Sequence, residues 1–121
     1  FAAQLKTLSA LDRQRIEERW PGHVTWILPD TEYPSWVSGG RATVACRVPD
    51  HEQARSIAEK MGRPIVSTSL NFAGEQPIKI YADAVAQFAQ FVDLVLPGEI
   101  GAAEGPSKIL QLHGAGTQSL R

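Results

Sequence analysis

The chain has 121 residues, a length that suits one compact domain. Hydrophobic residues make up 43% and charged residues 21%, close to the average of globular domains, which excludes a disordered chain. The net charge is −1, from 12 Lys and Arg against 13 Asp and Glu, and this balance argues against a protein whose whole surface binds nucleic acid, although a local basic patch stays open.

The first twenty residues have a helical pattern with a break in its middle. Ser9 followed three residues later by Asp12 resembles a capping box, so a second helix is expected to start there. Leu11, Ile16 and Trp20 are predicted to form its buried stripe. The sequence Trp20-Pro21-Gly22 is expected to end it.

A strand is predicted over residues 24–28, which are β-branched and aromatic. Residues 29–40 hold Pro, Gly, Asp and Ser and are predicted to form a loop, with Trp36-Val37 as an apolar anchor inside it. The next strand is predicted over residues 43–48.

Asp50 is expected to cap a helix over residues 51–61, which Gly62 closes. A third strand is predicted over residues 64–67, and a polar loop follows it.

The last part of the chain alternates between predicted helices and predicted strands. It predicts a helix over residues 82–91 with Val85, Phe88 and Ala89 inward, strands over 92–96 and 108–112, a loop over 97–106, and the start of a strand at 119–121. Alternating strands and helices predict an α/β fold, a sheet with helices packed on it, in a single domain over residues 1–121.

The stretch STSLNFAGE, residues 67–75, places hydroxyls and an amide directly after a predicted buried strand. In open α/β sheets ligands bind at the carboxyl ends of strands. Hydroxyls and backbone N–H groups suit a phosphate or a carboxylate, and Gly74 lets the backbone turn. The alternative is that Ser69 and Asn71 only satisfy a turn.

The chain has no GxxxxGK[ST] phosphate loop, no GxGxxG fingerprint and no Gly-x-Ser-x-Gly elbow. We therefore assign no catalytic nucleophile. His23, His51 and His113 are scattered, so no metal site is predicted, and Cys46 is the only cysteine. This cysteine usage fits a reducing, cytoplasmic setting, and no apolar run reaches the ~20 residues of a membrane span.

Two further places carry candidate binding groups. Residues 43, 45 and 47 of the second predicted strand share one face, so Thr43 and Arg47 flank the small Ala45 and leave space beside one positive charge. Ser107 in Gly105-Pro106-Ser107 places a hydroxyl where a loop meets a strand. The alternatives are an edge-strand arginine that reaches water and a plain turn.

Several runs in one order resemble a known family: WPGHVTWIL, then WVSGGRATVACRVPDH, then PIVSTSLNFAGEQP, then GPSKILQL and a final LR. They are similar to the PGPVT, TVAVRVPDH, STSAN-x-SG-x-P, PSTI and Leu-Arg strings of the YrdC-like threonylcarbamoyl-AMP synthases. The resemblance spans nearly the whole chain. It implies an α/β fold with a twisted mixed sheet, helices packed on it and a positively charged cleft.

The resemblance also implies an activity. Members join ATP, L-threonine and bicarbonate into threonylcarbamoyl-AMP and pyrophosphate, with Mg²⁺ in the ATP complex and no tightly bound cofactor. Partner proteins then transfer the threonylcarbamoyl group to adenosine in tRNA. The expected protein is a cytoplasmic nucleotidyltransferase of tRNA modification, which can form oligomers.

Site residues carry over where the motifs match. The resemblance implies that Arg47, Ser67 and Ser107 bind threonine. It implies that ATP is bound by Thr43, Ser69, Asn71, Pro77 and Arg121. Leu70 replaces the usual Ala and is expected to point into the core, because it alternates with Ser69 and Asn71.

The family begins earlier than this chain, with a Lys-x-Arg motif that has no counterpart here. We expect a domain that is incomplete at its N-terminus, inactive or nearly so alone, with apolar surface left uncovered. Two other functions stay open: a double-stranded RNA or tRNA-binding module without catalysis, and a carbamoyl-adenylate-forming domain of the hydrogenase-maturation type.

Overall fold

A computed structural model describes residues 1–30 and 32–121, and it divides into two compact units. Unit 1 comprises Phe1–Ile65 and Glu104–Arg121, and unit 2 comprises Val66–Ala103. The single domain over residues 1–121 remains a prediction. No helix of the described residues is long and apolar enough to cross a membrane.

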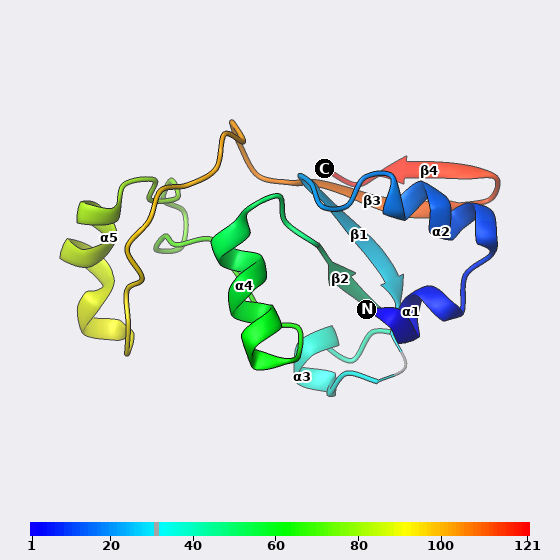
Figure 1. Ribbon diagram of the computed structural model, residues 1–121, viewed down its shortest axis with the longest axis horizontal. Coiled ribbons are helices and arrows are strands. Elements are labelled where there is room, and N and C mark those ends of the chain that lie inside the picture. Colours follow the sequence, from blue (N-terminus) through cyan, green and yellow to red (C-terminus); the bar gives the residue numbers. More distant parts are fainter. Residues whose placement is uncertain (31) are drawn as a thin grey trace. The chain divides into compact units, whose positions relative to one another are not determined.

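Unit 1 is built on a mixed sheet in the order β2-β1-β3-β4 (Figure 1). The strands are β1 (Val24–Pro29), β2 (Thr43–Cys46), β3 (Lys108–His113) and β4 (Gly116–Ser119). β1 is antiparallel to β2 and parallel to β3, and β3 and β4 form an antiparallel hairpin. The two central strands therefore come from opposite ends of the chain.

The last strand, β4, lies earlier in the chain than the predicted residues 119–121. β4 starts at Gly116 because Gly114, with φ +55°, makes the tight turn directly after His113. Its residues Gly-Thr-Gln-Ser are polar and exposed on both faces, so no apolar alternation marks it as a strand.

The two predicted N-terminal helices are confirmed as α1 (Ala2–Lys6) and α2 (Ala10–Glu17). The Ser9 side chain accepts a hydrogen bond from the Asp12 backbone N–H at 3.2 Å, so the predicted cap is present. In the predicted stripe Ile16 is fully buried, but Leu11 is 57% exposed. Leu11 lies five residues before Ile16, which is about 140° around a helix of 3.6 residues per turn, so the two side chains point to different faces.

One face of the sheet forms the core of unit 1. Trp26 and Leu28 of β1 are fully buried, and they cluster with Val44, Cys46, Leu110 and Ile16. Leu5, Leu8 and Trp20 of the N-terminal segment pack against this cluster. The N-terminal helices thus cover the core face through the buried Ile16.

The other face of the sheet is left open within unit 1. The register pairs Ile27 with Ala45 and Thr25 with Ile109, so these side chains alternate with the buried ones and lie on the opposite face. They are exposed or half-buried.

Two expectations in the middle of unit 1 need correction. The helix α4 (Glu52–Met61) is capped by His51 and not by Asp50: Ala54 N–H donates to Nδ1 of His51 at 3.3 Å. Residues 35–38 of the predicted loop form the short helix α3 (Ser35–Ser38), in which Val37 packs on the core while Trp36 is 76% exposed. Gly62 ends α4 with φ +63°, as predicted.

Unit 2 contains helix α5 (Tyr81–Phe88), the single 3₁₀ turn η1 (Ala89–Phe91) and no strand among its residues. Residues 64 and 65 of unit 1 form no strand either, so the strands predicted over 64–67 and 92–96 are wrong for this structure. Their apolar composition is strand-like, but a strand also needs a neighbour to accept its backbone hydrogen bonds.

Aromatic rings hold unit 2 together. The Phe72 ring stacks on Phe88 with centroids 4.8 Å apart, and Phe91 meets both rings edge-on at 6.2 and 6.4 Å. Of the residues expected to point inward, Phe88 does so, whereas Val85 is 38% exposed and Ala84 replaces Ala89 as the buried alanine.

Candidate functional site

Strand β2 presents the first group of predicted site residues on the open face of the sheet. Val44 and Cys46 point into the core, so Thr43 and Ala45 point the other way. Arg47 follows directly, continues the alternation and is exposed. Because Ala45 is small, the space between the Thr43 hydroxyl and the Arg47 guanidinium is not filled from β2 itself.

Ser107 comes to the same face from the other end of the chain. β1 and β3 run parallel, with Thr25 beside Ile109, and Ser107 directly precedes β3. The Thr25 and Ser107 hydroxyl oxygens are 2.7 Å apart, within hydrogen-bond distance.

The chain before Ser107 is tied to the start of β1. His23 Nε2 lies 2.8 Å from the Gly105 carbonyl oxygen, and Lys108 N–H donates to the His23 carbonyl at 3.2 Å. The His23 side chain therefore holds the GPS segment, residues 105–107, and its backbone holds Lys108, the residue that follows this segment.

Arg121 lies at the far end of the hairpin. Leu120 N–H donates to the Ile109 carbonyl, while Ile109 N–H donates to the Arg121 carbonyl, so two residues oppose one as in a β-bulge. The Arg121 guanidinium donates to the Ser107 carbonyl from Nε at 3.4 Å and from Nη2 at 3.3 Å. The structure thus brings Arg121 and Ser107 together.

The polar stretch STSLNFAGE lies in unit 2. Glu75 N–H donates to the Phe72 carbonyl at 3.0 Å, and Ile78 N–H donates to the Leu70 carbonyl at 2.9 Å. Gly74 has φ +85°, so the predicted turn at this glycine is confirmed. Leu70 is 37% exposed, so the prediction that it points into a core is wrong, since unit 2 has almost no core to receive it.

Asn71 is the one half-buried member of the polar series, whereas Ser67, Ser69 and Pro77 are exposed. Its Nδ2 donates to the Phe72 carbonyl at 2.9 Å, and its buried Oδ1 has no hydrogen-bond partner among the described residues. An orphaned oxygen of this kind calls for a donor or a cation.

The predicted site residues thus fall into two sets. Unit 1 holds Thr43, Arg47, Ser107 and Arg121, and unit 2 holds Ser67, Ser69, Asn71 and Pro77. The two units differ in their basic residues. Lys79 is the only basic residue in the sequence of unit 2, so the arginines that can grip an anion belong to unit 1.

Burial and hydrogen bonding shift the pKa values of titratable groups near β2. Burial raises the pKa of the Cys46 thiol to about 11, which leaves it a neutral, inert thiol. Burial also raises the pKa of Tyr33, and the Tyr33 backbone N–H lowers the pKa of Asp30 by donating to its carboxylate. Within the described residues no three His, Cys, Asp or Glu side chains gather to hold a metal ion.

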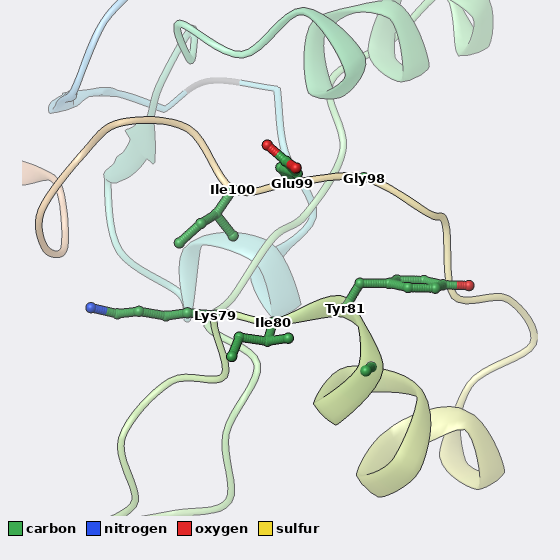
Figure 2. Close-up of a pocket in the computed structure, with 7 residues that line it drawn as sticks. Lys79, Ile80, Tyr81, Gly98, Glu99 and Ile100 are labelled. Atoms are coloured by element: carbon green, nitrogen blue, oxygen red, sulfur yellow. The ribbon is translucent and has the colours of Figure 1, made fainter.

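An open cavity of about 510 Å³ lies in unit 2 (Figure 2), and no predicted site residue is among those that line it. It is lined by Lys79, Ile80, Tyr81, Ala82, Gly98, Glu99 and Ile100. The Lys79 and Tyr81 side chains leave their segment in opposite directions (Figure 2), so the polar groups do not converge on one ligand position.

Sequence reasoning missed Thr25 and His23 as parts of this region. The available signal was a lone hydroxyl between Val24 and Trp26 in an otherwise apolar strand. The contact itself depends on the parallel pairing of β1 with β3. This pairing brings together Thr25 and Ser107, which are 82 positions apart in the sequence.

Comparison with known proteins identifies relatives of the whole chain. The model of the Sua5/YciO/YrdC family, described as telomere recombination, matches residues 2–121. The threonylcarbamoyl-AMP synthase of Halorhodospira halophila is 38% identical over 110 residues, which cover 90% of this chain and 58% of that protein. The synthase of Marinobacter nauticus is 40% identical over 95 residues, covering 77% of this chain and 50% of that protein.

Solved structures have the same fold. P. abyssi Sua5 complexed with L-threonine superimposes with a TM-score of 0.83 at 27% identity, over 94% of this chain and 34% of that one. E. coli YciO superimposes with a TM-score of 0.81 at 24% identity, over 100% of this chain and 61% of that one, a likeness of fold alone. The predicted α/β fold with a mixed sheet is confirmed. The chain spans about half the length of the curated relatives it matches.

Proposed function

The chain belongs to the Sua5/YciO/YrdC family, and from this membership we propose that it is part of an L-threonylcarbamoyladenylate synthase. The proposed substrates are ATP, L-threonine and bicarbonate, and the products are threonylcarbamoyl-AMP and pyrophosphate. This is a nucleotidyltransferase reaction in the cytoplasm, and its product serves threonylcarbamoyladenosine modification of tRNA through partner proteins.

The observation that carries the proposal is the placement of Arg47 and Ser107 on the same open face of the sheet. Arg47 is exposed beside the small Ala45, so a carboxylate can approach both arms of its guanidinium. The hydroxyl of Ser107 approaches that face from β3. A cation and a hydroxyl in this arrangement suit an amino acid, which presents a carboxylate and polar groups on one small frame.

Threonine is the proposed occupant of this face. Arg47 holds its carboxylate through two parallel N–H bonds, and Ser107 binds a second polar group. Ser67 is the third contact that the motif resemblance implies. The complex of P. abyssi Sua5 with L-threonine supports this choice of ligand among amino acids.

ATP is proposed to bind as its Mg²⁺ complex. The contacts that the motif resemblance implies for it are Thr43, Ser69, Asn71, Pro77 and Arg121. The unpartnered Oδ1 of Asn71 is an oxygen of the kind that Mg²⁺ prefers. Arg121 offers the remaining N–H groups of a guanidinium that Ser107 already orients.

The chemistry needs positioned groups more than acid–base residues. The threonine amine and bicarbonate condense to a carbamate with loss of water. A carbamate oxygen then attacks the α-phosphorus, the bond to the bridging oxygen breaks, and pyrophosphate leaves. Cations offset the negative charge, while hydroxyls and backbone N–H groups set the line of attack.

A graft tests the proposal. The chain replaces the matching 110 residues of the Halorhodospira halophila relative, and products are identified by mass spectrometry with ATP–Mg²⁺, bicarbonate and L-threonine. We expect threonylcarbamoyl-AMP from the graft, and far less from the 121-residue chain alone.

The same assay separates other outcomes. A bare carbamoyl-adenylate without threonine would assign the chain to carbamoyl transfer. A folded graft that forms no adenylate but binds structured RNA with a strong salt dependence would contradict the proposal and favour an RNA-binding module.

A further inference from the structure

The Thr25 hydroxyl makes a contact that the predicted site does not use. It lies 2.7 Å from the Ser107 hydroxyl, across the junction of two parallel strands. Both side chains are half-buried. A hydrogen bond of this length between two hydroxyls means that one of them donates its proton to the other.

The backbone around Ser107 is already held by other groups. His23 binds the Gly105 carbonyl at 2.8 Å, and Arg121 donates to the Ser107 carbonyl at 3.3 Å from Nη2. Lys108 N–H is paired with the His23 carbonyl. What remains free in Ser107 is the rotation of its side chain and the direction of its hydroxyl proton.

Each hydroxyl of this pair is the one side-chain partner of the other within the described residues, so either can be the donor. In both directions the contact ties Ser107 Oγ to Thr25 Oγ1 and selects one staggered rotamer of Ser107. The remaining hydrogen-bond capacity of Ser107 Oγ is then available to a ligand.

We propose that Thr25 is a positioning residue, whose hydroxyl holds the Ser107 side chain in one rotamer with its Oγ presented to the amino-acid ligand. The identity of that ligand rests on the proposed function. Thr25 itself touches no substrate in this proposal, because its hydrogen bond ends on Ser107.

Three variants separate positioning from a general structural role. Thr25→Val keeps the branched shape that β1 favours and removes only the hydroxyl. Thr25→Ser keeps the hydroxyl and should restore the wild-type behaviour. Thr117→Val is a matched control, because it removes the same hydroxyl from an exposed position on β4.

The first readout needs no ligand. NMR coupling constants between the Hα and Hβ atoms of Ser107 are measured in the 121-residue chain. The wild type, Thr25→Ser and Thr117→Val should show one staggered rotamer, and Thr25→Val an average over several. Unchanged Ser107 couplings in a folded Thr25→Val variant would overturn the proposal.

The second readout is the affinity of the graft for L-threonine, measured by calorimetry. Thr25→Val should weaken binding about fivefold, the loss expected for one oriented hydrogen bond, while leaving the affinity for ATP unchanged. Equal threonine affinity in wild type and Thr25→Val would contradict the positioning role. If wild type binds no threonine while Ser107 follows Thr25 in the couplings, the proposed function fails and the positioning of Ser107 stands.

Discussion

At the scale of single residues, the open face of the sheet explains why Arg47 can bind an anion while its neighbour Cys46 cannot react. Alternation along β2 sends Cys46 into the core, where it is 2% exposed, and sends Arg47 to the surface. One strand thus provides both an inert packing residue and the proposed anchor of the threonine carboxylate.

Replacing Arg47 by Lys tests that anchor. Lysine keeps the charge but cannot form two parallel N–H bonds, so KM for L-threonine in the graft should rise about tenfold with a smaller change in KM for ATP. Arg41→Lys is the control, because the Arg41 side chain donates weakly to the Ser38 carbonyl at 3.4 Å and has no proposed ligand. Equal effects of the two variants on threonine would remove Arg47 from the site.

The buried thiol gives a prediction about pH. Burial raises the pKa of Cys46 from 9.0 to about 11, so the folded state keeps a proton that the unfolded state loses. This contribution to stability is full below pH 9 and is lost as pH rises toward 11, by up to about 2 kcal/mol.

Urea unfolding at pH 8 and pH 10.5 measures this loss. The free energy of unfolding should fall more in the wild type than in Cys46→Ala, which has no thiol to ionise. The same fall in both proteins would show that Cys46 does not contribute to the alkaline destabilisation.

At the scale of elements, local signals predicted what local structure decides. The Ser9 cap, the start of β1 and the glycine that ends α4 follow from residue type and spacing, and all are present. The failures are non-local. Residues 64–67 and 92–96 have strand-like composition but pair with no neighbouring strand among the described residues. The contact between the Thr25 and Ser107 hydroxyls requires strands from both ends of the chain.

The candidate site shows the same division. Motif resemblance predicted which side chains take part, such as Arg47 and Ser107, because motifs carry residue type and order. It did not reveal that Asn71 Oδ1 lacks a hydrogen-bond partner or that Phe72 stacks on Phe88, since both depend on side-chain packing around the loop.

The aromatic cluster of unit 2 should control the order of the polar loop. Phe88→Ala removes the ring stacked on Phe72, directly after Asn71. Hydrogen exchange at the Ile78 amide, which donates to the Leu70 carbonyl, should then accelerate about tenfold. Tyr81→Ala removes a ring from the same helix but outside the cluster, and it should leave that amide unchanged. Equal acceleration in both would mean that helix α5 as a whole, not the ring stack, orders the loop.

At the scale of the whole molecule, the two units differ in how much apolar surface they bury. Unit 1 has a core around Trp26, whereas Ala84 is the one buried hydrophobic residue found in unit 2. Many large apolar side chains of unit 2 are exposed, among them Val66, Ile80, Phe91, Leu94 and Ile100. This matches the expectation of uncovered apolar surface.

Unit 2 should therefore open before unit 1. In native-state hydrogen exchange with increasing urea, amides of α5 should exchange at lower urea than amides of β1. Ile16→Ala, which removes a fully buried side chain from unit 1, should lower the stability of β1 by about 2–4 kcal/mol and leave α5 unaffected. A single transition for all amides would show that the chain unfolds as one unit.

The central claim is that the open face of the sheet binds the amino acid. Titration of L-threonine into the ¹⁵N-labelled 121-residue chain, followed by amide chemical shifts, tests it residue by residue. The account predicts saturable shifts at Arg47 and Ser107 that D-threonine does not reproduce. Saturable shifts confined to other residues, or no shifts at any concentration of L-threonine, would contradict it.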